Sequence, residues 1–207
     1  MAIISNAVTI ADAGAFSASL GSMTHIKTLT ASGSANLSFV HGAASVVLDN
    51  TYPIYIFKII NCHPSQQGGD GDEFSVGFRD GSTAYDAPKT STFFSSVHGE
   101  DGSGGAVAYR DSHDQANATG FQTLAVDMDA DNDTQVSGEL TLFNPSSTTF
   151  VKHFIWRGNH VHSSAGIQDT YVAGYCNVTA AIDAVQFKMS AGNIDAGVIK
   201  LYGIADS

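Results

Sequence analysis

The chain has 207 residues and carries 20 acidic against 9 basic side chains, which gives a net charge of −11 at neutral pH. Such an acidic surface repels phosphate backbones and anionic lipid headgroups, and the nine cations are scattered, so nucleic-acid and membrane-surface partners are excluded. No apolar run approaches the length of a membrane span. A chain of this length can form one domain with a substantial core.

The choice of residues favours an all-β fold. The acids are 17 Asp and only 3 Glu, and the chain also contains 21 Gly. Asp and Gly favour turns, whereas Glu is comfortable inside helices. This composition is typical of short strands joined by many turns.

The N-terminal segment, residues 1–22, is small and weakly apolar and lacks strand alternation, which predicts an arm or a packing segment. The first cation is Lys27, so the basic region of a secretory signal is absent. We therefore expect synthesis in a cytosol and a single β domain over residues 23–207.

From residue 24 onward, runs rich in β-branched and aromatic residues alternate with turn-rich stretches, as in an all-β sandwich or barrel. No long helical segment is compelling, so two antiparallel sheets are expected rather than a parallel sheet with crossover helices. The expected strands are His25–Thr30, Asn36–His41, Pro53–Ile60, Phe74–Arg79, Phe121–Val126, Ser137–Phe143, Phe150–Trp156, Thr170–Cys176, Val185–Met189 and Val198–Tyr202.

The strand at 53–60 is apolar on nearly both faces, because Ile54 and Ile56 alternate with Tyr55 and Phe57. Such a strand lies centrally in a core or faces a partner subunit. Ile54 and Ile56 are therefore candidate interface residues.

Two long turn-rich stretches, residues 64–72 and 99–120, interrupt the strand pattern. Long loops of this kind usually lie at a rim, where they bind a ligand or contact a neighbour. A solvated acidic loop is the other interpretation.

Four carboxylates, Asp127, Asp129, Asp131 and Asp133, occupy alternate positions and could wrap oxygen ligands around Ca²⁺. The spacing departs from an EF-hand loop, since Gly138 stands at the twelfth position. The alternative is an acidic hairpin tip.

His160 and His162 fall on one face of a strand, which suits Zn²⁺ if a third ligand arrives; His153 and Asp169 are the nearest candidates. A histidine cluster at a subunit interface, with copies meeting on an axis, is the stronger interpretation.

Tyr109 and Trp156, with Tyr171 and Tyr175, could form a platform on which sugars stack. Aromatic residues in strands also serve as core or interface residues. Both interpretations stay open.

No catalytic motif is present: the sequence has no Gly-x-Ser-x-Gly elbow and no phosphate-binding loop. Its three glutamates, Glu73, Glu100 and Glu139, are expected to be solvated rather than paired for glycoside hydrolysis. Cys62 and Cys176 are expected to be buried free thiols. We do not expect an enzyme.

Three stretches of the chain are Ser137–Lys152 (SGELTLFNPSSTTFVK), Ile26–Phe39 (IKTLTASGSANLSF) and Gly192–Ile204 (GNIDAGVIKLYGI). Together they resemble small all-β structural proteins of marine tailed bacteriophages. The resemblance covers most of the chain from about residue 24, and its motifs are structural rather than catalytic.

This resemblance implies a virion protein made in the bacterial host cytoplasm: a jelly-roll-like, two-sheet β-sandwich present in many copies, as a tail appendage or a head decoration. The implied partners are further copies, commonly as a homotrimer, and other virion proteins. The alternative function is a carbohydrate- or host-receptor-binding module of the tail that uses the loop at 99–120.

Overall fold

The computed structural model describes residues 3–5, 8–12, 15–16, 22–66 and 72–205. Antiparallel strands make up the regular structure of these residues, apart from one helical turn, η1 (Asp111–His113). No helix in the described ranges is long and apolar enough to cross a membrane. The all-β, antiparallel part of the prediction is confirmed.

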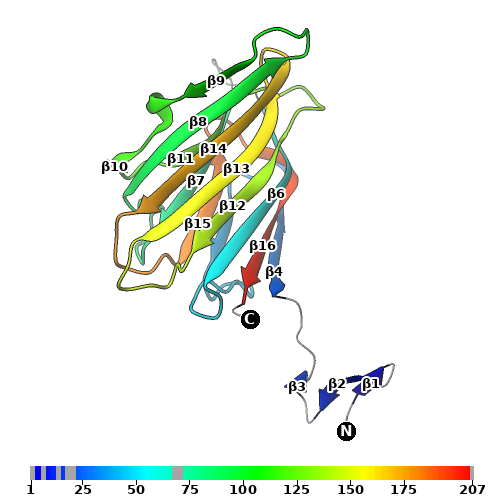
Figure 1. The fold of residues 1–207 in the computed structure, drawn as a ribbon, viewed down its shortest axis with the longest axis vertical. Coiled ribbons are helices and arrows are strands. Elements are labelled where there is room, and N and C mark those ends of the chain that lie inside the picture. Colours follow the sequence, from blue (N-terminus) through cyan, green and yellow to red (C-terminus); the bar gives the residue numbers. More distant parts are fainter. Residues whose placement is uncertain (1–2, 6–7, 13–14, 17–21, 67–71, 206–207) are drawn as a thin grey trace.

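The N-terminal segment contributes a small sheet of its own, in the order β1 (Ile3–Ser5), β2 (Val8–Asp12) and β3 (Ala15–Phe16). Among the described residues, these three strands pair with one another and with no strand of the large sheet (Figure 1).

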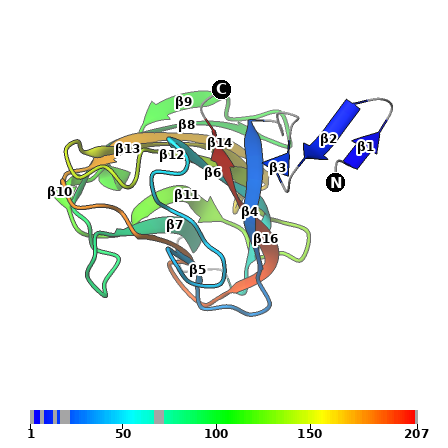
Figure 2. The same cartoon turned by 90° about the horizontal axis from the view of Figure 1, so that it is seen from below.

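All other strands belong to one large antiparallel sheet, which curls so that two parts of it face each other (Figure 2). The first part runs in the order β4 (Met23–Thr30), β16 (Ile194–Ile204), β6 (Ile54–Pro64), β12 (Val136–Phe143), β13 (Lys152–His162), β14 (Gly166–Cys176) and β8 (Lys89–Gly99). Two short strands, β9 (Ala106–Tyr109) and β10 (Ala116–Ala118), pair with β8 beyond it.

The second part of the sheet runs in the order β11 (Gln122–Met128), β7 (Asp72–Arg79), β15 (Ala184–Met189) and β5 (Leu37–Val40). It joins the first part through one pair of residues, Met128 of β11 and His162 of β13. At the other end, a bridge between Ser34 and Ile194 brings the segment before β5 next to β16. The sheet therefore nearly closes on itself.

Aromatic side chains hold the two parts together. Phe57 of β6 lies with its ring centre 5.3 Å from that of Phe39 and 5.5 Å from that of Phe187. Phe78 and Phe154 have ring centres 5.0 Å apart. All five side chains are fully buried, so each excludes from water an apolar surface that contributes about 2–3 kcal/mol.

All ten expected strands are present where alternation or continuous apolar character predicts them, although β6, β13, β14 and β16 each extend four to six residues beyond an expected end. β6 is a central strand, between β16 and β12, as its two apolar faces indicated. The large-sheet strands that were not predicted are β8, β9 and β10. β9, η1 and β10 all lie in the stretch expected to be a loop at 99–120, and residues 67–71 of the other expected loop lie outside the described residues.

Candidate functional site

The first part of the sheet turns one side toward the core and the other side outward. We call the outward side of β6, β12, β13, β14, β8 and β9 the outer face. Its side chains include Ile54, Ile56, Lys58, Glu139, Thr141, His153, Ile155, Arg157, Ile167, Tyr171, Ala173, Tyr175, Thr90, Thr92, Phe94, Val107 and Tyr109.

Large apolar side chains are exposed mainly on the outer face. Of the eight large hydrophobic residues that are exposed in the described ranges, five lie on β13, β14, β8 and β9 of this face. They are Ile155 (50% exposed), Ile167 (48%), Phe94 (42%), Val107 (78%) and Tyr109 (61%). Scattered single residues are ordinary on a protein surface, but a group on four neighbouring strands is typical of a contact surface.

A ladder of stacked groups crosses the outer face. Arg157, Tyr171, Phe94 and Tyr109 are register partners on the successive strands β13, β14, β8 and β9. The rings of Phe94 and Tyr171 are parallel, with centres 4.7 Å apart, and the Arg157 guanidinium lies 5.0 Å from the Tyr171 ring centre. Because the rings stack on each other, they stand on edge from the sheet and form a wall.

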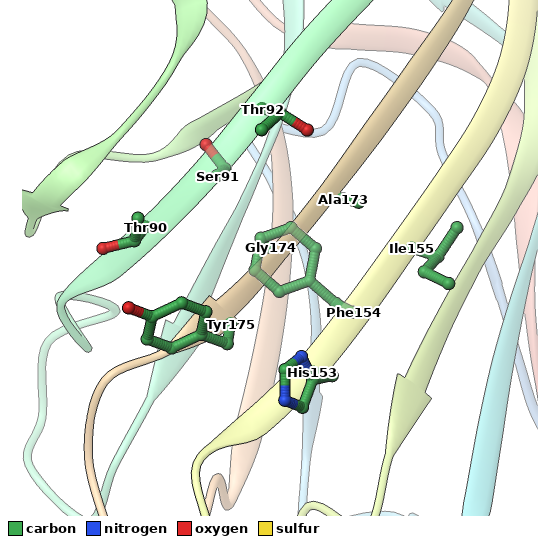
Figure 3. Close-up of a pocket in the computed structure, with 9 residues that line it drawn as sticks. All are labelled: Thr90, Ser91, Thr92, His153, Phe154, Ile155, Ala173, Gly174 and Tyr175. Atoms are coloured by element: carbon green, nitrogen blue, oxygen red, sulfur yellow. The ribbon is translucent and has the colours of Figure 1, made fainter.

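A groove of about 460 Å³ runs beside this wall, across β13, β14 and β8 (Figure 3). Its floor is formed by Ile155, Ala173 and Thr92, which are register partners. His153 and Tyr175 lie at its other end, with ring centres 5.8 Å apart. The groove exists because the middle strand carries a small side chain, an alanine, between larger ones on its neighbours.

The groove continues past Ile155 into a second depression of about 340 Å³, over β12 and β6. There Lys58 and Glu139 form an ion pair across the two strands. Both side chains are more than a third exposed, so the pair contributes little to stability and mainly sets the charge pattern of the surface.

The structure places the predicted interface residues in two different environments. Ile54 and Ile56 lie half-buried on the outer face of β6. His160, in contrast, points into the core and is only 1% exposed, so the prediction that it contacts a neighbouring subunit is wrong. His162 also lies on the inner side, where its Nε2 is 3.5 Å from Asp127 Oδ2 and its Nδ1 is 2.8 Å from Ser164 Oγ.

His160 and His162 do not form a metal site. His160 Nε2 is 2.6 Å from the carbonyl oxygen of Val126, to which it donates its proton. The suggested third ligands, His153 and Asp169, are on the opposite side of the sheet. Within the described ranges, no three His, Cys, Asp or Glu side chains come together in a group that could hold a metal ion.

Asp127, Asp129, Asp131 and Asp133, the ligands of the predicted calcium site, also form no such group among the described residues. Asp129 Oδ1 instead accepts hydrogen bonds from the backbone N–H groups of residues 130 and 131, at 2.7 and 3.2 Å. The hairpin alternative is also wrong: β11 and β12 do not pair, so the segment is a connection between the two parts of the sheet.

The two residues predicted to stack on sugars, Trp156 and Tyr109, lie on opposite sides of the sheet. Trp156 is fully buried and donates from Nε1 to Thr170 Oγ1 at 3.0 Å, so it is a core residue and cannot stack on an external ligand. Tyr109 is on the outer face, and its hydroxyl donates to the carboxylate of Asp114. That bond raises the pKa of Tyr109.

Sequence reasoning missed Phe94, Ile155 and Arg157, which shape the groove and its wall. Period-two alternation from the buried Trp156 would have placed Ile155 and Arg157 on the outer side. No comparable signal marked Phe94, because its strand is rich in Ser and Thr.

The chain matches no protein-family model, no curated protein and no solved structure.

Proposed function

We propose that this protein is a multi-copy structural component of a bacteriophage particle, a jelly-roll-like β-sandwich that contacts further copies and other virion proteins through its outer face. The observation that carries the proposal is the gathering of Ile155, Ile167, Phe94, Val107 and Tyr109 on neighbouring strands of one exposed surface.

The outer face is large enough for a stable contact. Six neighbouring strands about 4.8 Å apart, four of them eleven residues long at about 3.4 Å per residue, present roughly 900 Å². A standard interface buries about 800 Å² on each partner. Apolar area buried there would contribute about 25 cal/mol per Å² before the cost of association is subtracted.

The geometry favours a protein partner over a stacked sugar at this face. A sugar stacks on the flat side of an exposed ring. Here the flat sides of Phe94 and Tyr171 face each other, and Arg157 covers the far side of Tyr171. A partner can therefore contact the edges of these rings, together with Ile155 in the groove beside them.

Light scattering after size-exclusion chromatography tests the proposal. We expect a trimer or larger assembly for the wild type and a monomer for the double variant Phe94→Ser, Ile155→Thr. Phe150→Ser is the matched control, because Phe150 is 70% exposed but lies between β12 and β13, outside the strands of the outer face.

A monomeric wild type at micromolar concentration would overturn the proposed assembly. The same holds if the double variant and the control keep the wild-type mass. Circular dichroism of both variants verifies that the β fold is retained.

A further inference from the structure

A row of charged side chains crosses the outward side of the sheet. Lys200 of β16, Lys58 of β6, Glu139 of β12 and Arg157 of β13 are successive register partners, and we call these four residues the charged row. Lys200 points outward like the other three, because both of its neighbours in β16 are buried. The row leads directly into the aromatic wall on β14, β8 and β9.

The charged row is positive on a protein that is strongly negative. Lys58 pairs with Glu139, and Arg157 Nη2 lies 3.4 Å from Asp169 Oδ2. Among the described residues Lys200 has no ion pair, and it stands directly opposite Lys58, a placement of like charges that destabilises a sheet. Three cations and two carboxylates leave this surface with a net charge of +1, whereas the whole chain carries −11.

The surface is also hollowed at the charged row. The depression of about 340 Å³ over β12 and β6 is lined by Lys58, Glu139 and Arg157, together with Thr141 and Ile155. A convex segment of a partner could enter it, with carboxylates against the two cations and apolar atoms against the isoleucine. The depression therefore fits an acidic, protruding segment.

Acidic side chains gather at one end of the sheet, around the turn that joins β13 to β14 (Figure 1). Backbone hydrogen bonds of 3.0 and 2.8 Å tie the loop after β8 and the segment after β11 to this turn. His63 links that segment to β16, since its Nε2 is 3.1 Å from the Asp131 carbonyl oxygen and its Nδ1 is 3.8 Å from Asp195 Oδ2. We call the carboxylates brought together there the acidic end: Glu100, Asp101, Asp127, Asp129, Asp131, Asp133 and Asp195.

The acidic end is too far from Lys200 and Arg157 to neutralise them within one molecule. Lys200 is five residues from Asp195 along β16, and Arg157 is five residues from His162 at the end of β13. At about 3.4 Å per residue, five residues span roughly 17 Å. Charges so far apart are largely screened, because the Debye length is about 8 Å at physiological ionic strength. Both surfaces therefore remain available to another molecule.

Charge limits how copies of this chain can meet. Two molecules of net charge −11 repel each other on average, so a stable contact must place a positive surface against a negative one. A symmetric contact between two outer faces would instead bring two charged rows together. Asp131 and Asp133 are exposed at the acidic end, in the connection between β11 and β12, where they can enter the depression of a neighbour.

We propose that the acidic end of one copy, through Asp131 and Asp133, docks on the charged row of the next copy at Lys200, Lys58 and Arg157. This inference rests on the proposed assembly and names the two surfaces that meet in it. Because the two surfaces differ, the contact is head-to-tail, and its repetition closes a ring of three or more copies or extends a filament.

Charge reversal tests the contact, with light scattering of the full chain after size-exclusion chromatography as the measurement. A row variant carries Lys58→Glu and Lys200→Glu, an end variant carries Asp131→Lys and Asp133→Lys, and a swapped variant carries all four substitutions. Lys188→Glu is the matched control, because Lys188 is a half-buried strand lysine like Lys200 but lies on β15, in the other part of the sheet. Circular dichroism verifies the fold of each variant.

We expect the row variant and the end variant each to associate about tenfold or more weakly than the wild type, since each brings like charges into contact. The swapped variant should recover the wild-type mass, because it restores opposite charges across the contact, and the control should keep that mass. The wild-type assembly should also weaken as NaCl rises from about 50 to about 500 mM.

The outcomes separate this inference from the proposed assembly. A wild type that assembles, but whose mass the row or the end variant retains, would overturn the head-to-tail contact and leave the proposed assembly standing. The same holds for a folded swapped variant that stays monomeric, for an assembly that is insensitive to salt, or for a wild type that stops at a dimer. A monomeric wild type would overturn both proposals.

Discussion

Acidification should destabilise the fold through His160. This side chain is almost completely buried, and burial lowers its pKa to about 4. Its Nε2 hydrogen bond to the Val126 carbonyl and the carboxylate of Asp127 act in the opposite direction, whereas His162 lowers the pKa further. In the folded protein at neutral pH, His160 is therefore uncharged, with its proton on Nε2.

The size of the effect follows from the two protonation states. The unfolded chain takes up this proton near pH 6.5 and the folded chain near pH 4, so between these values the unfolded state binds more protons. The stabilisation is complete above pH 6.5 and is lost as the pH falls toward 4. The difference between pKa values of 6.5 and about 4 corresponds to about 3 kcal/mol of the free energy of unfolding. About 1.4 kcal/mol of it is lost by pH 5.5.

Urea unfolding at about pH 7.5 and pH 5.5 measures this loss for the wild type, for His160→Gln and for His98→Gln. The His160→Gln variant keeps a donor for the Val126 carbonyl but has no titrating group. The control removes the exposed His98 instead. The wild type and the control should lose about 1.4 kcal/mol more than His160→Gln. An equal loss in all three proteins would refute the argument that the buried imidazole stays neutral.

Three further predictions concern the core. Lys152→Met should destabilise the fold by about 2 kcal/mol or more, measured by urea unfolding, because the buried ammonium donates to three backbone carbonyls that would lose their donor; unchanged stability would contradict this. Gly158→Ala should cost about 1–3 kcal/mol, since its Cβ would lie 2.2 Å from the indole ring of the buried tryptophan, whereas Gly105→Ala, where the nearest atom is 3.7 Å away, should cost almost nothing. Cys62 and Cys176 should resist a thiol reagent at neutral pH until urea unfolds the chain, because burial raises the pKa of each thiol to about 12; rapid native-state labelling would show that the core opens.

The sequence predicts most of the sheet because most strands alternate or are continuously apolar. β8 was missed because several of its inward positions are polar: Lys89, Ser91 and Ser95 are all buried. The two buried serines have partners distant in sequence: the Ser91 hydroxyl donates to Gln122, and the Ser95 hydroxyl accepts from Arg110. The local sequence pattern does not reveal such partners.

The candidate sites were harder to predict than the strands. The sequence suggested an interface role for His160 and a sugar-stacking role for Trp156, but both are buried. A strand with large residues on both sides does not reveal which side faces inward. In β13, Trp156 is buried and its neighbour Ile155 is half-exposed, although either could occupy a core. The groove on the outer face depends on a register that places Ile155, Ala173 and Thr92 side by side, and no local pattern specifies that register.

The edge of the sheet beyond β8 limits edge-to-edge pairing between molecules, which would lead to fibres. An eleven-residue strand with unpaired backbone groups would be a template for another chain. Here that margin is divided between β9, of four residues, and β10, of three, with the helical turn η1 between them. A neighbouring molecule meets two short, offset segments and cannot extend the sheet along a continuous edge. At this margin, copies that lie beside one another can therefore meet through side chains, while the backbone hydrogen-bond ladder ends within each molecule.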